Sequence, residues 1–202
     1  ALAERLKDPN EYWGWPTGIA YETQVIKQAD IVQLFCLHPD MYSIDTMRKN
    51  YSYYEKRTHH RSSLSPAVHS IVASQIGFPE QAYHYFQKSL TIDLYSTNPP
   101  ASGGTFIGGI HTAACGIAWQ MVVFGFAGIE ATDEGIFCKP HIPQQWNSVQ
   151  FTLHYRGLSC LVTLSPESVK VDAAYSNSAA VPFKIKDQQY SIEAGSTITI
   201  TL

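Results

Sequence analysis

The sequence predicts an α+β protein in which a helical region, residues 1–135, precedes a small antiparallel β-sandwich, residues 136–202. Apolar residues recur with a period near 3.6 along the first region and with a period of two along the last. The spacing changes near residues 131–146. Helices paired through short loops are typical of an α/α barrel. Five helices are too few to close such a barrel, so we expect further polypeptide to complete it.

Four amphipathic helices are expected before residue 95. They span residues 24–37, 40–54, 65–76 and 80–94. In the third, Ser65 is expected as the N-cap, Pro66 as the first helical residue and Gly77 as the stop signal. A fifth helix, residues 110–126, is apolar almost all round. An all-round apolar helix is normally buried, so we expect this one to lie inside a large core.

The β region is predicted from short alternating segments separated by turn residues. The expected strands span residues 149–155, 159–164, 168–172, 183–185 and 197–202, with a turn at Arg156-Gly157 between the first two. Short strands at this regular spacing favour a small antiparallel sandwich.

Composition excludes some classes of function. The net charge is -3, and charged residues make up only 15% of the chain while aromatic residues make up 12%. This balance suits a carbohydrate site or a piece that buries extra surface, and it disfavours nucleic-acid binding. The longest uncharged stretch, residues 94–129, is interrupted by polar residues and proline, so we expect no membrane-spanning helix. With no signal peptide apparent, a cytoplasmic location is expected.

The cysteines and histidines predict neither a disulfide framework nor a metal site. The four cysteines, Cys36, Cys115, Cys138 and Cys160, form no CxxC pair, and we expect buried free thiols in a reducing compartment. The eight histidines are dispersed without ligand spacing.

A polar run at residues 58–65 is the strongest indication of function. It places hydroxyl, imidazole and guanidinium groups where the N-terminus of a helix is expected. Unpaired N–H groups at such an end favour an anion, most simply phosphate. The alternative is an ordinary capped loop whose polar residues are solvated.

Four motif blocks resemble, in chain order, those of glycoside hydrolase family 65, which includes inverting disaccharide phosphorylases. The resemblance runs from about residue 11 to residue 164 and implies the second half of an (α/α)6 barrel followed by a β-sandwich. The blocks lie at residues 25–32, at 50–55 with 60–69, at 108–114 with 119–120 and 124–128, and at 140–146 with 151 and 155–157.

The resemblance implies a phosphate site formed by Ser62, Ser63 and His111, with His60 lining or shaping the same pocket. Hydroxyls and an imidazole supply the donors that phosphate needs. The alternative for His111 is a core histidine bonded to backbone.

The resemblance also assigns Lys27 and Gln28 to the hydroxyls of the transferred glucosyl group. The alternative is a solvated helix turn. Arg61 departs from the family, which usually has a carboxylate there, and this leaves the acceptor sugar open.

The mechanism implied is a single displacement at the anomeric carbon, in which phosphate replaces the water and the general base of an inverting hydrolase. The family's general acid is a glutamate upstream of these motifs. Glu11, Glu22 and Glu55 do not match its motif, so we expect no catalytic residue in this chain and no activity from it alone.

Three functions remain open from the sequence. The first is an α-glucosyl disaccharide phosphorylase that yields β-glucose 1-phosphate, with inorganic phosphate as co-substrate, no cofactor, the preceding N-terminal polypeptide as partner and a homodimeric assembly. The second is an α-glucoside hydrolase of the same fold. The third is a non-catalytic carbohydrate-binding module, which would expose aromatic side chains on the sheet face of residues 149–202.

Overall fold

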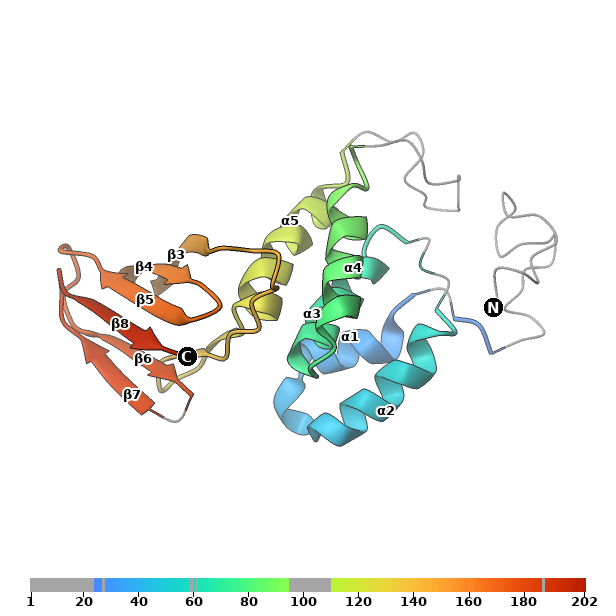
Figure 1. Ribbon diagram of the computed structural model, residues 1–202, viewed down its shortest axis with the longest axis horizontal. Helices are drawn as coiled ribbons and strands as arrows, with labels where there is room; N and C mark the ends of the chain where they lie inside the picture. The colour runs from blue at the N-terminus through green and yellow to red at the C-terminus, as the bar shows by residue number, and fades with distance from the viewer. Residues whose placement is uncertain (1–23, 27, 59, 61, 95–109, 187) are drawn as a thin grey trace. The chain divides into compact units, whose positions relative to one another are not determined.

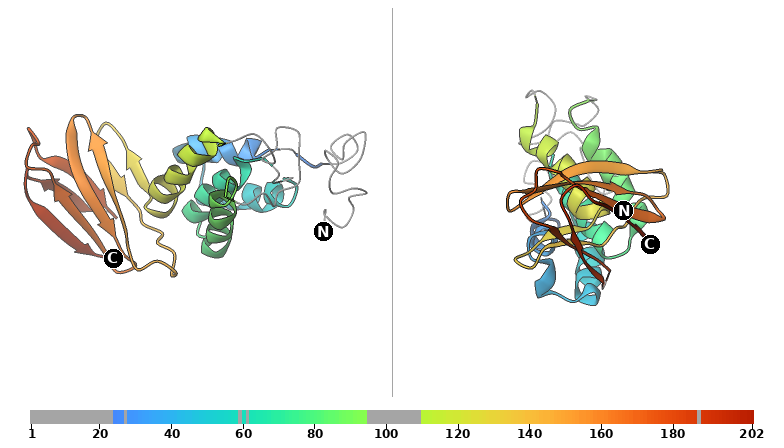
Figure 2. Two further views of the ribbon diagram at one scale, coloured as in Figure 1. Left: turned by 90° about the horizontal axis from the view of Figure 1, so that it is seen from above. Right: turned by 90° about the vertical axis from the view of Figure 1, so that its left-hand side faces the viewer.

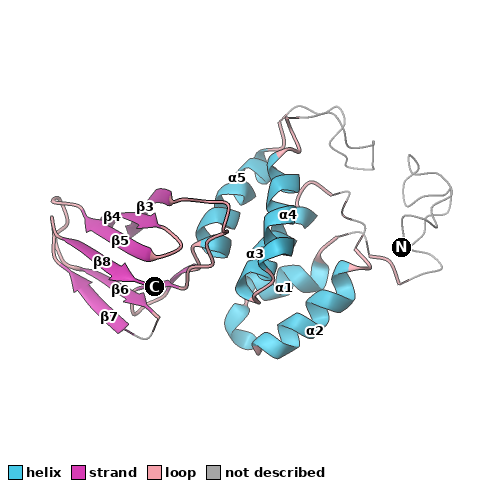
Figure 3. Ribbon diagram, in the orientation of Figure 1, coloured by secondary structure: helices cyan, strands magenta, loops and turns pink. Residues whose placement is uncertain are grey.

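The computed structural model describes residues 24–26, 28–58, 60, 62–94, 110–186 and 188–202. The chain divides into two compact units, residues 1–121 and 122–202 (Figure 1). Colouring by secondary structure separates the helices α1–α5 of the first unit from the strands of the second (Figure 3).

The division lies earlier than the change of period near residue 135. Val123 and Ala127 belong to the core of the second unit, and so do the short strands β1 (Ile129–Ala131) and β2 (Ile136–Cys138). Strands of three residues are too short to produce a recognisable alternation, so the sequence pattern shifts only after them. The domain boundary at 135 stays a prediction for the complete protein.

Five α-helices are present in the described part of the first unit. They are α1 (Asp30–Leu37), α2 (Ile44–Glu55), α3 (Ser65–Gln75), α4 (Pro79–Leu90) and α5 (Thr112–Gln120), with a 3-10 turn, η4 (Pro39–Met41), between the first two. Helix α3 is the centre of this unit, because all its residues from Ser65 to Ser74 are buried. The other helices surround it: α1, α2, α4 and α5 all pack against it.

The first helix begins later than its apolar period predicts. The expected span was residues 24–37, whereas α1 begins at Asp30. Upstream of α1, the N–H of Ile26 donates to the carbonyl of Arg57 at 2.9 Å, and Ile26 forms a parallel β-bridge with Thr58. This tertiary pairing holds the segment extended, so local helical periodicity is overridden.

The expected cap of α3 is also wrong. Ser65 is the first helical residue rather than the N-cap, and Leu64 occupies the cap position without a side-chain cap bond. The Ser65 hydroxyl bonds instead to Nδ1 of His60, at 3.2 Å. Ser65 therefore bonds to the loop before the helix instead of capping the helix.

The last two helices are shorter than expected. Helix α4 ends at Leu90 rather than at residue 94, and the predicted helix 110–126 is split into α5 and a π-helical stretch, η5 (Met121–Phe126). Only Ala114 of α5 is buried, and Trp119 is 49% exposed. The expectation of a buried helix is thus not met within the described residues.

The second unit contains two four-stranded sheets, ordered β1-β2-β6-β7 and β3-β4-β5-β8, which form two layers (Figure 2). The six longer strands are β3 (Val149–Tyr155), β4 (Leu158–Leu164), β5 (Ser168–Ala173), β6 (Val181–Ile185), β7 (Gln188–Ile192) and β8 (Thr197–Thr201). Buried residues of both sheets share one apolar core. The predicted sandwich is present, with β1, β2 and β7 in addition.

One strand pair departs from the antiparallel prediction. Strand β2 pairs with β6 in parallel, with Ile136 opposite Phe183. The whole β3–β4–β5 meander lies between these two strands in sequence, which provides the long connection that a parallel pair requires. The predicted Arg156-Gly157 turn is confirmed. Its φ values of 50° and 80° match a two-residue type I′ hairpin.

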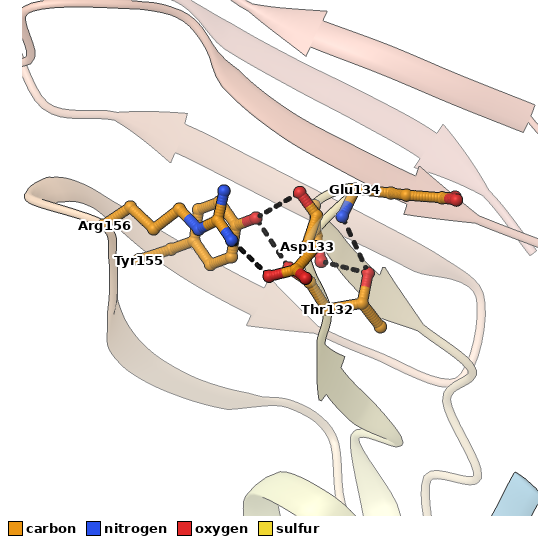
Figure 4. Close-up of polar contacts among 6 residues, drawn as sticks. Thr132, Asp133, Glu134, Tyr155 and Arg156 are labelled. Carbon is orange, nitrogen blue, oxygen red and sulfur yellow. Dashed lines mark hydrogen bonds and ion pairs between the residues drawn. The ribbon is translucent and has the colours of Figure 1, made fainter.

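A polar clamp joins the two sheets at the β3–β4 hairpin (Figure 4). The Tyr155 hydroxyl donates to the carbonyl of Thr132 at 2.7 Å, and the Arg156 guanidinium pairs with Asp133. Thr132 and Asp133 lie in the β1–β2 turn. Turns from different sheets are thus bonded to each other, which fixes the sandwich at this edge.

The burial of the cysteines agrees only in part with the sequence prediction. All four cysteines are free, and burial raises the pKa of Cys138 to about 12 and that of Cys160 to about 11. Cys115, however, is exposed on α5 and Cys36 is half-buried, so the prediction of buried thiols is wrong for these two. Among the described residues, no helix has both the length and the hydropathy to cross a membrane.

Candidate functional site

The predicted sugar and phosphate segments are brought together by a backbone bridge. Ile26 pairs with Thr58 in parallel. Gln28 comes two residues after Ile26 in the sequence, and His60 comes two residues after Thr58. Gln28 is exposed. Two segments that are far apart in sequence are therefore joined at this bridge. Lys27 and Arg61 lie outside the described residues.

The backbone next to this bridge is tied to the C-terminus of α2. The Thr58 hydroxyl donates to the carbonyl of Tyr54 at 2.8 Å, and the N–H of Arg57 donates to the same carbonyl at 3.0 Å. The guanidinium of Arg57 lies 3.7 Å from the centroid of the Tyr53 ring. The chain therefore enters the polar loop from a fixed position.

His60 stands at the centre of a half-buried polar network. Its Nε2 lies 3.1 Å from the carbonyl oxygen of Glu55 and 3.1 Å from the Tyr85 hydroxyl, while its Nδ1 faces the Ser65 hydroxyl. The Tyr85 hydroxyl donates to the Glu55 carboxylate at 2.7 Å. Both ring nitrogens of His60 thus have protein partners, which suits a residue that shapes the pocket rather than one that only contacts a ligand.

A second histidine supports this network from inside α3. His69 is fully buried, and its ring lies 4.5 Å from that of His60 and 5.4 Å from that of Tyr85, between centroids. Its Nδ1 bonds the carbonyl of Ser65 at 2.8 Å. Burial lowers the pKa of His69 to about 4, so the ring is neutral near pH 7.

The two candidate phosphate serines follow directly after this network. Both are half-buried and precede the first turn of α3. The Ser62 hydroxyl accepts the N–H of Leu64 at 3.3 Å, whereas Ser63 makes no hydrogen bond to any described residue. A hydroxyl at the start of a buried helix, with its donor capacity unspent, is a suitable anion ligand.

His111 is fixed by a carboxylate that sequence reasoning missed. Asp93 accepts the backbone N–H of His111 at 2.8 Å and bonds its Nδ1 at 2.6 Å. These hydrogen bonds hold the pKa of Asp93 below its usual value. With Nδ1 engaged, Nε2 is the ring atom left to meet a ligand. The reading of His111 as a backbone-bonded core histidine does not fit, because its partner is a side-chain carboxylate.

The structure brings some predicted site residues together and leaves others apart. Gln28, His60, Ser62 and Ser63 belong to one continuous region next to the start of α3. His111 precedes α5, which packs against α3 and α4, but no described hydrogen bond joins it to the two serines. Tyr85 and Asp93 were missed because they lie outside the polar run, and Glu55 was considered only as a general acid. Tyr85 in particular lies on a helix that the sequence predicts only as amphipathic.

The donor set favours an anion over a cation. Among the described residues, no group of three His, Cys, Asp or Glu side chains gathers as a metal ion would require. Hydroxyls and imidazoles next to a helix N-terminus are instead suited to the oxygens of a phosphate.

Comparison with known proteins assigns the chain to a family. Residues 6–120 match the glycosyl hydrolase family 65 central catalytic domain, and residues 129–192 match the C-terminal domain of the same family. The chain belongs to glycosyl hydrolase family 65. The resemblance of the motif blocks is thereby confirmed.

The relatives found are phosphorylases. The chain is 48% identical over 170 residues to 1,2-alpha-glucosylglycerol phosphorylase of Bacillus selenitireducens, covering 84% of this chain and 22% of the relative. It is 36% identical over 190 residues to kojibiose phosphorylase of Caldanaerobacter subterraneus, covering 92% and 24%. A nigerose phosphorylase of Lachnoclostridium phytofermentans is 35% identical, covering 84% and 23%.

A solved structure has a similar fold. A protein described as a kojibiose phosphorylase from the human microbiome superposes with a TM-score of 0.80 at 29% identity, covering 94% of this chain and 27% of that one. The chain thus spans about a quarter of the length of the proteins it matches.

The β unit offers little support for a separate carbohydrate-binding module. Such a module would expose aromatic side chains on the sheet face. Among the aromatic residues between positions 146 and 202, all of them described, Phe183 is buried, Trp146, Phe151, Tyr155 and Tyr190 are half-buried, and Tyr175 alone is exposed, at 90%. One exposed ring does not form a stacking platform for a sugar.

Proposed function

We propose that this chain forms the phosphate subsite and part of the glucosyl subsite of an inverting α-glucosyl disaccharide phosphorylase. The observation that carries the proposal is the pairing of Ile26 with Thr58, because it joins the backbone shortly before Gln28 to the backbone shortly before Ser62 and Ser63. A phosphorolytic site needs sugar and phosphate in contact, and the family resemblance assigns these two segments to those two ligands.

In this reaction phosphate attacks the anomeric carbon from the face opposite the leaving sugar. Hydroxyl donors at Ser62 and Ser63 and the imidazole of His111, oriented by Asp93, hold the phosphate oxygens for attack. Because phosphate is already an anion at neutral pH, no general base is needed. The proton for the leaving oxygen comes from an acid that the complete enzyme supplies outside this chain.

The complete protein is proposed to finish an (α/α)6 barrel around these helices. Large apolar side chains remain exposed in the helical unit, among them Leu37 at 62% and Ile110 at 75%. A preceding N-terminal polypeptide would cover such surface. We extend the proposal to a cytoplasmic homodimer that needs inorganic phosphate and no cofactor.

The proposal is tested by disaccharide cleavage in the complete polypeptide. Kojibiose, nigerose, trehalose, maltose and glucosylglycerol are each incubated with and without inorganic phosphate, and β-glucose 1-phosphate is followed. Phosphate-dependent formation of that product supports the proposal. Release of free glucose at the same rate without phosphate would overturn it.

Variants in the loop localise the phosphate site. Ser62→Ala and Ser63→Ala each remove one hydroxyl from a charged ligand, so the KM for phosphate should rise by roughly tenfold to a hundredfold. Ser52→Ala is the matched control, since Ser52 is exposed on α2. An equal KM in all three variants would place the phosphate elsewhere.

A hydrolase remains the second candidate because a carboxylate lies beside the loop. Glu55 is half-buried, and its Oε1 accepts the Tyr85 hydroxyl. If Glu55 were the base of a hydrolase, Glu55→Gln would abolish cleavage, since the amide cannot take a proton from water. A phosphorylase should retain most of its activity, because the Gln oxygen still accepts from Tyr85.

A further inference from the structure

We propose that Tyr85 is a positioning residue for the phosphate site: its hydroxyl, held by Glu55, fixes the His60 ring and thereby the backbone that presents Ser62 and Ser63. This inference rests on the proposed function and deepens it. It assigns a role to a side chain on α4 that the sequence motifs do not mark.

The hydrogen-bond directions follow from the partners. The Tyr85 hydroxyl gives its single proton to the Glu55 carboxylate, at 2.7 Å, so its oxygen is left to accept. The backbone carbonyl of Glu55 can only accept. His60 Nε2 lies 3.1 Å from each of these two oxygens, so Nε2 carries the proton and donates.

The opposite ring nitrogen is then fixed as well. With Nε2 protonated, neutral His60 has Nδ1 as an acceptor, and the Ser65 hydroxyl donates to it at 3.2 Å. One ring therefore connects the end of α2, the side of α4 and the first residue of α3. Glu55 orients Tyr85, Tyr85 orients His60, and Ser65 completes the set.

The backbone at His60 shows why such positioning is needed. Its φ is 43°, in the left-handed region that a residue with a Cβ adopts only when its surroundings enforce it. This conformation turns the chain between Thr58, which is held in the β-bridge, and the serine pair. A loosened ring would let the backbone relax and move the serine hydroxyls away from the phosphate oxygens.

The environment of the network is consistent with a rigid support. Tyr85 is buried, and burial followed by the bond to Glu55 raises the pKa of its phenol, so it stays a donor at working pH. The buried His69 ring packs against both Tyr85 and His60. No member of this support except the loop itself needs to touch the substrate.

The test compares Tyr85→Phe with Tyr83→Phe in the complete polypeptide. Both residues are on α4, but the Tyr83 hydroxyl makes no hydrogen bond to described residues, so its removal should change nothing. Tyr85→Phe should raise the KM for phosphate by roughly tenfold, with a much smaller change in the KM for the disaccharide. Direct titration with inorganic phosphate should show the same loss of affinity.

A second variant keeps the test decisive if Tyr85→Phe does not fold. Ser65→Ala removes the partner on the other side of the His60 ring and should weaken phosphate in the same direction. A lower melting temperature with an unchanged KM for phosphate in both variants would show a purely structural role and overturn the inference. Absence of phosphate binding by the unmodified enzyme would overturn the proposed function itself.

Discussion

The two units of this chain differ in the kinds of residue that they bury. In the β unit the core is purely apolar, and the buried set runs from Val123 to Ile192 without a polar member. In the helical unit the buried polar or charged residues of the described chain gather: Thr58, Ser65, His69, Ser70, Ser74 and Ser89. The helical unit also carries most of the exposed large apolar side chains.

The difference separates stability from function. The β unit buries its apolar residues in one core shared by its two sheets. The helical unit has an apolar core as well, but it also buries polar residues and leaves several large apolar side chains exposed. Buried polar networks cost desolvation unless every member is paired, and they are retained where a particular geometry is needed. This difference fits the proposal that the helical unit holds the site and packs against further polypeptide.

The largest effect is expected from emptying the β core. Phe183 is fully buried on β6, and Phe183→Ala should lower the free energy of unfolding of the β unit by about 3–5 kcal/mol. Hydrogen exchange of the β4 and β6 amides measures this loss, and Gln188→Ala, at an exposed site on β7, serves as the control. If α3 amides lost equal protection, the two units would not be independent.

A pH effect of about 3 kcal/mol is expected in the helical unit from His69. His69 has a pKa lowered by burial to about 4 in the folded state, against 6.5 when unfolded. Below pH 6.5 His69 takes up a proton in the unfolded chain but stays neutral in the folded chain. Stability is thus full above pH 6.5 and falls progressively as the pH drops toward 4.

The measurement is denaturant unfolding of the helical unit between pH 7.5 and pH 4, in the parent and in His69→Gln. The glutamine variant is less stable at neutral pH, but its unfolding free energy should fall less over this window. His154→Gln, on an exposed position of β3, should keep the parent's slope. An unchanged slope in His69→Gln would contradict the assignment.

A pair of glycines in the β unit should differ by more than 1 kcal/mol. Gly128 and Gly157 both have positive φ, 58° and 80°. A Cβ at Gly128 would stand 2.0 Å from the carbonyl oxygen of Lys139, whereas one at Gly157 meets nothing within 4 Å. Gly157→Ala should cost about 1–2 kcal/mol from backbone strain alone, and Gly128→Ala that amount plus the clash. Thermal unfolding of both variants gives the difference, and equal values would show that the backbone relaxes freely.

A structural feature could be predicted from the sequence when the interaction that determines it joins residues close together in the chain. The β3–β4 hairpin and the end of α3 shortly before Gly77 were predicted because their signals are local. The start of α1 and the cap of α3 were not, since Ile26 pairs with Thr58 and Ser65 bonds His60 across the fold. Three-residue strands such as β1 carry too little pattern to be read.

The candidate site divides in the same way. Ser62, Ser63 and His111 could be proposed from the sequence because they lie in motif blocks or at expected helix starts. Asp93 and Tyr85 act through partners 18 and 25 residues away, and no spacing rule connects them. Supporting residues of this kind become visible only when the tertiary structure places a hydroxyl or a carboxylate against the ring it orients.

The smallest effect in this chain tests whether its exposed apolar surface is covered in the complete protein. Leu37 is 62% exposed, so Leu37→Lys should change the unfolding free energy of this chain by less than about 0.5 kcal/mol. Thr199→Lys, on an exposed position of β8, should be equally neutral.

In the complete polypeptide the two variants should differ in unfolding free energy. A lysine buried at position 37 without a partner would cost several times more there, because a charge would lose its water. Calorimetric unfolding of both variants in both contexts measures this. If Leu37→Lys stayed neutral in the complete protein, the N-terminal polypeptide would have to dock elsewhere.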